Sequence, residues 1–212
     1  LGNQFLANIR ETDAILHVLR CFDNDNIVHV DGNVNPIRDK ETIDMELQLK
    51  DLETVDKKLE KVKRAAKTGN KEAQKEEAVL LKIKSALEAG TSVRALEFSK
   101  EDYEEFVSPA QFITDKPVMY VCNVDEASAA TGNAYVEKVR EAVKDENAEI
   151  LVLAVGTEAD INELDDYEER KMFLQDIGLD EPGSSKLIRS AYKLLNQQTY
   201  FTAGVKEVRA WT

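Results

Sequence analysis

The stretch Lys116 to Glu126, KPVMYVCNVDE, decides the fold of this chain. Its apolar run, Val118 to Cys122, is rich in strand formers and stops abruptly at Asn123. Such a run is typical of a buried strand in a parallel sheet. Ligands bind at the carboxyl ends of strands in open α/β sheets, so the polar residues from 123 onward are candidate ligand contacts. On this stretch alone, an ordinary core strand followed by a polar turn is an equally good interpretation.

A second apolar run, Ile150 to Val155, follows an amphipathic segment at 133–144. Strand, helix and strand in this order predict a right-handed parallel unit. The loop at Asn123–Glu126 and the loop at Val155–Thr157 are then expected at the same edge of the sheet. Upstream, a helical pattern over 1–10 leads into an apolar strand at 14–22, which adds to the α/β signature. Two loops at one edge can hold the two faces of one ligand.

Length, charge and cysteine content limit the classes of protein. The 212 residues carry a formal net charge of −13, which argues against whole-surface binding to nucleic acid. No apolar run is long enough to span a bilayer, so no membrane role is expected. Cys21 and Cys122 lack metal-ligand spacing, and buried, reduced thiols in a cytoplasmic protein are expected. His17 and His29 are interpreted as packed core residues of strands, and no catalytic residue or metal ligand is assigned.

A helical hairpin interrupts the α/β pattern. From Glu41 to Ala66 there is no glycine or proline, and Asp39 is expected to cap this helix. Its apolar residues step by three and four as in a coiled coil, at Met45, Leu49, Leu52, Val55, Leu59, Val62 and Ala66. Gly69 and Asn70 end this helix and begin the next, Lys71 to Ala89, whose apolar face is Ala73, Leu80, Ile83 and Leu87. So short a turn predicts antiparallel helices.

The turn of this hairpin is basic. Between Asp56 and Lys75, eight basic side chains stand against three acidic ones. We name these eight the basic tip: Lys57, Lys58, Lys61, Lys63, Arg64, Lys67, Lys71 and Lys75. Either they form the solvated surface of a coiled coil, or they dock on RNA phosphates. Because the tip has no aromatic residue, little base specificity is expected, and no DNA sequence specificity.

The loop Asn123-Val124-Asp125-Glu126 is related to a known way of reading a nucleotide base. Guanine-specific switches use Asn-Lys-x-Asp at the end of a strand, and their aspartate accepts hydrogen bonds from guanine. Here Val replaces Lys, and Glu126 is longer by one methylene. Both changes damage the guanine contacts, so adenine can be accepted instead.

Several longer motifs resemble the YchF branch of the Obg-related P-loop GTPases. They are NIRETDA at 8–14, RCF at 20–22, HVDGNVNPIRD at 29–39, DLETV at 51–55, NVDE at 123–126 and FTAGVKEVRAWT at 201–212. The resemblance runs along the whole chain. It implies a nucleotide-binding α/β domain, an inserted coiled-coil arm and a carboxy-terminal β-grasp (TGS) domain. Family members accept ATP or GTP with Mg²⁺, hydrolyse ATP slowly and associate with ribosomes.

The resemblance assigns roles to particular residues. Asn123, Val124 and Glu126 are expected to contact the base, and Ala154, Val155 and Gly156 to close over it. The basic tip is expected to meet the ribosome or ribosomal RNA. Four parts are expected: nucleotide-binding domain at 1–38 and 98–197, coiled-coil arm at 39–97, and the start of a truncated TGS domain at 198–212.

The sequence also departs from the family pattern. It contains no Gly-x-x-x-x-Gly-Lys-Ser/Thr loop. Asp-x-Pro-Gly occurs once, at 180–183, but no apolar strand run precedes it there, so it is not interpreted as a metal loop. The phosphate-binding and Mg²⁺-binding residues are therefore expected before Leu1, and these 212 residues alone are expected to be inactive as a hydrolase. A non-enzymatic coiled-coil module that binds RNA or protein is the alternative interpretation.

Overall fold

The computed structural model describes residues 2–212, apart from the side chain of Asn3. Contacts divide the chain into two compact units. The first consists of residues up to Ile15 together with Arg38–Lys116, and the second of Leu16–Ile37 together with Pro117–Thr212. No helix among residues 2–212 is both long enough and apolar enough to cross a membrane. Each unit is described by itself.

The second unit contains a sheet of three strands in the order β1-β2-β3. They are β1 (Ile15–Arg20), β2 (Val118–Asn123) and β3 (Glu149–Leu153). β2 and β3 run parallel, with Tyr120 opposite Ile150 and Asn123 opposite Leu153. The prediction that the apolar run at 118–122 is a buried strand of an α/β fold is thereby confirmed, since all five residues are buried.

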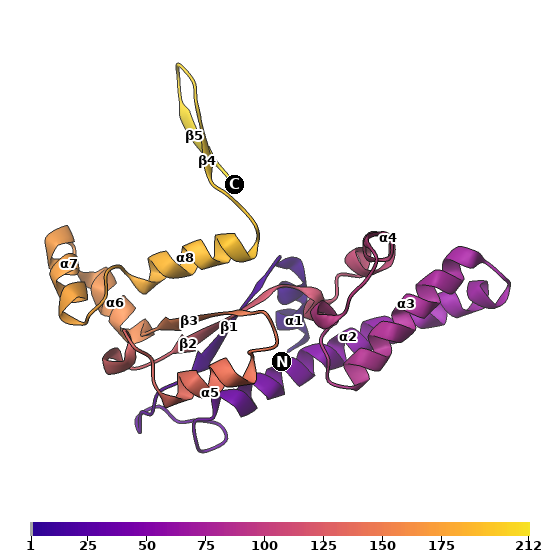
Figure 1. The fold of residues 1–212 in the computed structure, drawn as a ribbon, viewed down its shortest axis with the longest axis horizontal. Helices are drawn as coiled ribbons and strands as arrows, with labels where there is room; N and C mark the ends of the chain where they lie inside the picture. Colours follow the sequence, from indigo (N-terminus) through magenta and orange to yellow (C-terminus); the bar gives the residue numbers. More distant parts are fainter. Residues whose placement is uncertain (1) are drawn as a thin grey trace. The chain divides into compact units, whose positions relative to one another are not determined.

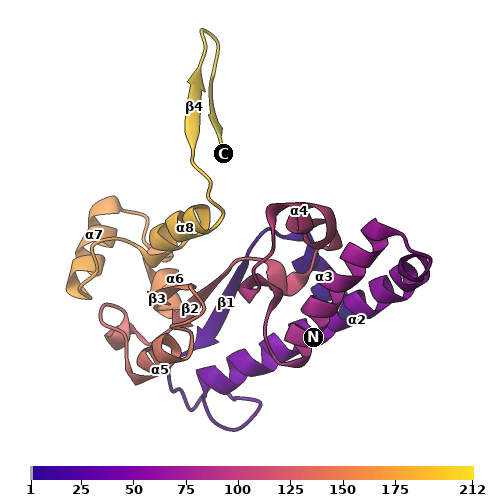
Figure 2. The ribbon, with the colours of Figure 1, turned by 45° about the vertical axis from the view of Figure 1, so that its right-hand side comes forward.

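Four helices belong to the same unit: α5 (Ala134–Ala142), α6 (Val155–Glu163), α7 (Tyr167–Asp176) and α8 (Gly183–Leu194). α5 and α8 lie on opposite sides of the sheet (Figures 1 and 2). Side chains alternate along a strand, so one face of β2 packs on each helix. Met119 and Val121 pack with Leu187 and Leu194 of α8.

The first unit is mainly helical. It contains α1 (Asn3–Glu11), α2 (Pro36–Lys67), α3 (Lys71–Glu88) and a turn α4 (Lys100–Asp102) that continues as a π-helical turn (Tyr103–Val107). Short 3₁₀ turns lie at Val93–Ala95, Ser108–Ala110 and Ile113–Asp115. α2 and α3 lie side by side (Figures 1 and 2).

The predicted turn between α2 and α3 is confirmed. Gly69 has a φ of +88°, which a residue with a Cβ rarely adopts. The Asn70 side chain accepts hydrogen bonds from the N–H groups of Glu72 and Ala73, so it caps α3. However, α2 begins at Pro36, three residues before the cap expected at Asp39. Proline suits the first position of a helix, where its missing N–H costs no hydrogen bond.

The apolar seam is confirmed for α3 and for the second half of α2. Val55 packs with Leu80, Ile83 and Leu87, and Ala73 is buried too. The prediction that Met45 and Leu49 belong to this seam was wrong, because they are 60 % and 55 % exposed.

Met45 and Leu49 are exposed because α3 ends beside this part of α2. The Gln48 side chain donates to the Gly90 carbonyl, so the partner helix ends beside this part of α2. Leu47 is buried instead, and it packs with Leu6 of α1 and with Ile113.

Asp51 of α2 is a fully buried carboxylate that ties the first unit together. It accepts hydrogen bonds from the N–H groups of Ile113 (2.9 Å) and Thr114 (2.7 Å) and from the Thr114 hydroxyl (2.8 Å). The Thr114 Oγ1 in turn accepts from the Val93 N–H at 3.1 Å. One side chain therefore fixes the segment that leads into β2.

The rest of the second unit agrees with the sequence-based expectations in part. His29 does not lie in a buried strand: residues 21–35 form an irregular segment in which Val28 and Val30 are almost fully exposed. His17 does lie in β1, half-buried, with its ring 5.7 Å from that of Tyr120. Helix α7 begins at Tyr167, and the Asp166 side chain caps it. The chain after α8 forms a hairpin, β4 (Tyr200–Ala203) antiparallel to β5 (Val208–Trp211).

Candidate nucleotide-binding site

The ends of β2 and β3 bring the two predicted segments of the site together. Asn123, at the end of β2, accepts a hydrogen bond through Oδ1 from the N–H of Val155 at 3.0 Å. The next residue, Val124, donates its N–H to the Leu153 carbonyl at 2.9 Å. Parallel neighbours end at the same edge of a sheet, which is why residues 32 positions apart meet here. The expected meeting of these segments is confirmed.

The loop after Asn123 exposes one carboxylate and buries one apolar side chain. Glu126 opens a 3₁₀ turn (Glu126–Ser128) and is exposed, and its carboxylate forms no hydrogen bond or ion pair with the rest of residues 2–212. Asp125 accepts a hydrogen bond from the Ser128 N–H at 2.9 Å and so fixes the turn. Val124 is only 3 % exposed. Its side chain was expected to contact the base, but it packs in the protein and leaves Asn123 and Glu126 to face a ligand.

The closing segment is the first turn of helix α6, whereas the sequence predicted a loop at 155–157. Ala154 is buried, Val155 is 47 % exposed, and a Cβ placed on Gly156 would meet nothing within 4 Å. The N–H groups in the first turn of a helix have no partner within the helix, and the helix dipole favours acceptors there. Asn123 satisfies the first of these groups. The neighbouring backbone can therefore donate to a ring nitrogen or carbonyl of a ligand.

A buried carboxylate holds α6 in place. Glu158 accepts hydrogen bonds from the N–H groups of Gly183 (2.6 Å) and Ser184 (3.0 Å), so it caps α8 from another helix. A Cβ on Gly183 would lie 2.8 Å from Leu153 Cγ and 2.9 Å from Glu158 Oε1, so a larger residue would displace the side chains that pack against it. Ser184 and Ser185 are of a residue type common at helix caps, but they lie inside α8. A capping residue 25 positions away leaves no local signal.

Two thiols lie next to Asn123, one in β2 and one directly after β1. Cys21 and Cys122 are both buried and free, as predicted. The N–H of Cys21 donates to the Asn123 carbonyl at 2.7 Å, so the cysteine after β1 also fixes the end of β2. A hydrogen bond with Cys122, together with burial, raises the pKa of Cys21 above its ordinary range. We therefore assign this pair a packing role.

The basic tip lies at the joined ends of α2 and α3. All of its side chains are exposed except that of Lys58, which is half-exposed. Within residues 2–212, only Lys75 of this group forms an ion pair, at 3.1 Å from Glu101. Seven positive charges therefore remain without a counter-charge in close contact.

Known proteins resemble the chain along its whole length, although no protein-family model matches it. It is 52 % identical over 212 residues to "Ribosome-binding ATPase YchF" of Escherichia coli O157:H7. The protein of the same name from Bacillus subtilis (strain 168) is 47 % identical over 214 residues.

Among solved structures, the Schizosaccharomyces pombe YchF GTPase superposes on the whole chain, with a TM-score of 0.88 and 31 % identity. The chain spans 58 % of each of the two bacterial relatives and 57 % of the yeast chain. Because both sequence and fold agree over all of its residues, the chain belongs to the YchF family.

Proposed function

We propose that this chain supplies the base-recognition part of a nucleotide-binding protein that hydrolyses ATP slowly and acts on ribosomes. The observation that carries the proposal is the hydrogen bond between Asn123 Oδ1 and the Val155 N–H, beside the exposed Glu126 carboxylate. The bond locks together two segments that can lie on either side of a purine. A mere interaction module is not favoured, because relatives that match the whole chain are named ribosome-binding ATPases.

Adenine fits this arrangement better than guanine. Glu126 can accept a hydrogen bond from the exocyclic amino group of adenine, while the first turn of α6 offers N–H donors to a ring nitrogen. The buried Val124 offers no counterpart to the lysine of guanine-specific loops. The contact surface in this proposal consists of Asn123, Glu126, Val155 and Gly156, with Val124 and Ala154 packed behind them.

The remaining parts of the active site are proposed to lie outside these residues. The sequence holds no phosphate-binding loop, and its Asp-x-Pro-Gly string at 180–183 leads into α8 and does not follow a strand. ATP phosphates and Mg²⁺ would then bind to another part of the protein. The β4–β5 hairpin would begin a TGS domain, and α2 with α3 would form a coiled-coil arm. A ribosome-associated protein of this kind is expected in the cytoplasm.

The basic tip is proposed to dock on ribosomal RNA. Seven positive charges without a close counter-charge, six of them on exposed side chains, repel one another, and phosphates relieve this repulsion. Binding through phosphates releases counterions, so it weakens steeply as salt is added.

Neutralising the tip should weaken ribosome binding and reduce its dependence on salt. We expect glutamine at Lys57, Lys58, Lys61 and Arg64 to lower the slope of log affinity against log salt by up to about 0.9 for each phosphate that these side chains neutralise. Co-sedimentation with ribosomes over a range of salt concentrations measures both quantities. The matched control places glutamine at Lys138, Lys144, Lys171 and Lys193 of the second unit. Unchanged affinity and slope in the tip variant would refute the docking role.

A further inference from the structure

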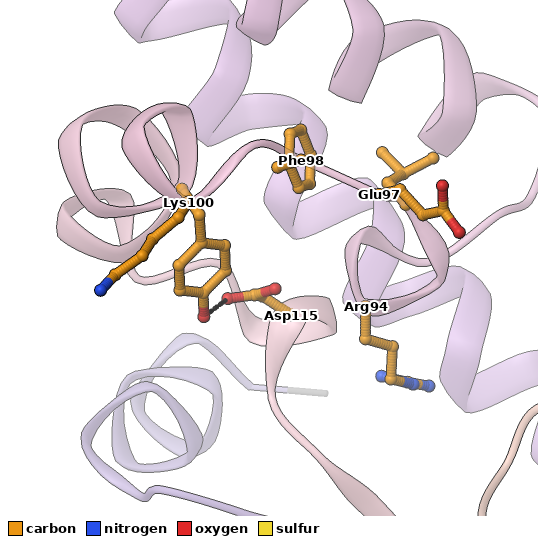
Figure 3. Close-up of a pocket in the computed structure, with 7 residues that line it drawn as sticks. Arg94, Glu97, Phe98, Lys100 and Asp115 are labelled. Atoms are coloured by element: carbon orange, nitrogen blue, oxygen red, sulfur yellow. Dashed lines mark hydrogen bonds between the residues drawn. The ribbon is translucent and has the colours of Figure 1, made fainter.

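The first unit contains an open pocket that the proposed nucleotide site does not use. It lies between the segment around Arg94–Phe98, the start of α4 and the 3₁₀ turn that ends at Asp115 (Figure 3). Its volume is about 620 Å³, which is enough for one nucleotide. Its lining combines two aromatic rings, two carboxylates and two cations, in Phe98, Tyr103, Glu97, Asp115, Arg94 and Lys100.

An aromatic ring and a carboxylate are held together on one side of the pocket. Tyr103 donates its hydroxyl hydrogen to Asp115 Oδ2 at 2.9 Å, and its side chain remains 40 % exposed. Asp115 Oδ1 accepts no hydrogen bond from any residue of the described chain, so it is available to a ligand. Burial, chiefly, raises the pKa of Tyr103 to about 12. The ring therefore stays neutral, and it offers a surface on which a base can stack.

Two cations at the pocket still have free donors. Arg94 donates one N–H, from Nη1, to the Thr114 carbonyl at 3.1 Å, which leaves its other N–H groups available. Lys100 is highly exposed and is only loosely paired, 3.7 Å from Glu104. Each can contact a phosphate next to a base in the pocket.

An ion pair connects the pocket to the basic tip. Lys75, a member of the tip, contacts Glu101, the residue after Lys100. The Lys82 ammonium of α3 lies 4.8 Å from the centre of the Phe98 ring. A strand of RNA on the tip can therefore continue into the pocket. The tip has no aromatic residue, whereas two aromatic rings line the pocket.

We propose that this pocket holds one unpaired nucleotide, preferably guanosine, of the RNA that the basic tip contacts. The inference rests on the proposed docking of the tip on RNA. Guanine carries two adjacent donors, N1–H and the 2-amino group, that a single carboxylate can accept, whereas adenine lacks this pair. A peptide would also fit the volume, but the stacking ring and the link to the tip favour a nucleotide.

Binding of single-stranded RNA to the chain tests the proposal. The probes are two fluorescein-labelled uridine hexamers, one with a central guanosine and one with a central adenosine, followed by fluorescence anisotropy. We expect Tyr103→Ala to weaken binding about tenfold, because stacking on an aromatic ring contributes roughly this factor. Tyr103→Phe keeps the ring and should stay within about twofold of the wild type. Asp115→Asn should remove the preference for guanosine.

A second measurement separates this inference from the docking role of the tip. Guanosine monophosphate is added to isotope-labelled chain, and the amide NMR signals of Tyr103 and Asp115 report on the pocket, while that of Gly156 reports on the proposed ATP site. Shifts at Tyr103 and Asp115 that vanish in Tyr103→Ala would support the pocket even if the tip variant bound ribosomes normally. RNA affinity unchanged in Tyr103→Ala, with no shift at these two residues, would overturn the assignment and leave the pocket to a peptide.

Discussion

Replacing Asp51 with alanine is expected to lower the free energy of unfolding by about 4 kcal/mol. The carboxylate is fully buried and accepts three hydrogen bonds, two from the N–H groups of Ile113 and Thr114 and one from the Thr114 hydroxyl. Alanine would leave these donors buried without partners, and each costs about 1–3 kcal/mol when unsatisfied. Urea denaturation followed by circular dichroism measures the change.

Asp56→Ala on the same helix is the matched control. Asp56 pairs with Lys84 at 2.6 Å, but its side chain is more than half exposed. Surface ion pairs contribute only about 0–1 kcal/mol, so this variant should remain close to the wild type. Equal losses in the two variants would show that Asp51 does not organise the first unit.

The same carboxyl should also affect stability as a function of pH. Burial raises the pKa of Asp51, although the hydrogen bonds from Thr114 and Ile113 act in the opposite direction. A group whose pKa is raised on folding stabilises the fold fully below its unfolded pKa, about 3.9 for aspartate. That contribution is lost as the pH rises through the folded pKa. The stability difference between wild type and Asp51→Ala should therefore increase as the pH falls from 7 towards 4.

Asn123→Ala is expected to weaken ATP binding by about 10- to 100-fold in a protein that joins this chain to a phosphate-binding loop. The substitution removes the acceptor for the Val155 N–H and with it the lock between the two segments of the site. It also removes the proposed contact with the base. Together these losses correspond to about 1.4–2.8 kcal/mol, in the range of one or two hydrogen bonds.

Asn70→Ala separates the effect on binding from an effect on folding. Asn70 also bonds backbone N–H groups at the start of a helix, but in the first unit. Losing such a cap costs about 1 kcal/mol of stability, and it should leave ATP affinity unchanged. Isothermal titration calorimetry of both variants gives the comparison. Equal ATP affinities for Asn123→Ala and the wild type would remove Asn123 from the site.

Much of the fold could be predicted because its signals are local. The run at 118–122 is apolar along its whole length, as a strand buried on both faces must be. Asn70 and Asn133 cap helices within three residues of their own positions. Gly69 takes the left-handed conformation that its place in the turn suggested.

The missed features depend on residues that are distant in the sequence. Helix α6 begins at Val155 because Asn123, at the end of strand β2, accepts a hydrogen bond from the first N–H of the helix. Met45 and Leu49 fit a helical seam, yet the partner helix ends before it reaches them. Periodicity shows which residues share a helix face, but it does not show how far the partner extends.

The candidate site shows the same division. The sequence predicted that the segments at 123–126 and 154–156 meet, because parallel strands end at one edge. It did not predict that Val124 is buried, because a residue between polar neighbours in a loop is expected to be exposed. Nor could it predict the support from Glu158, whose partner Gly183 gives no sign of close packing in the sequence.

The measurement that tests base recognition most directly is a paired titration with ATP and GTP. The protein should carry this chain together with a phosphate-binding loop, and Mg²⁺ should be present. We predict tighter binding of ATP, because Glu126 and the first turn of α6 suit adenine. We also predict that Glu126→Asp moves the ratio towards GTP. Tighter binding of GTP by the wild type would contradict the account, because Glu126 would then read guanine.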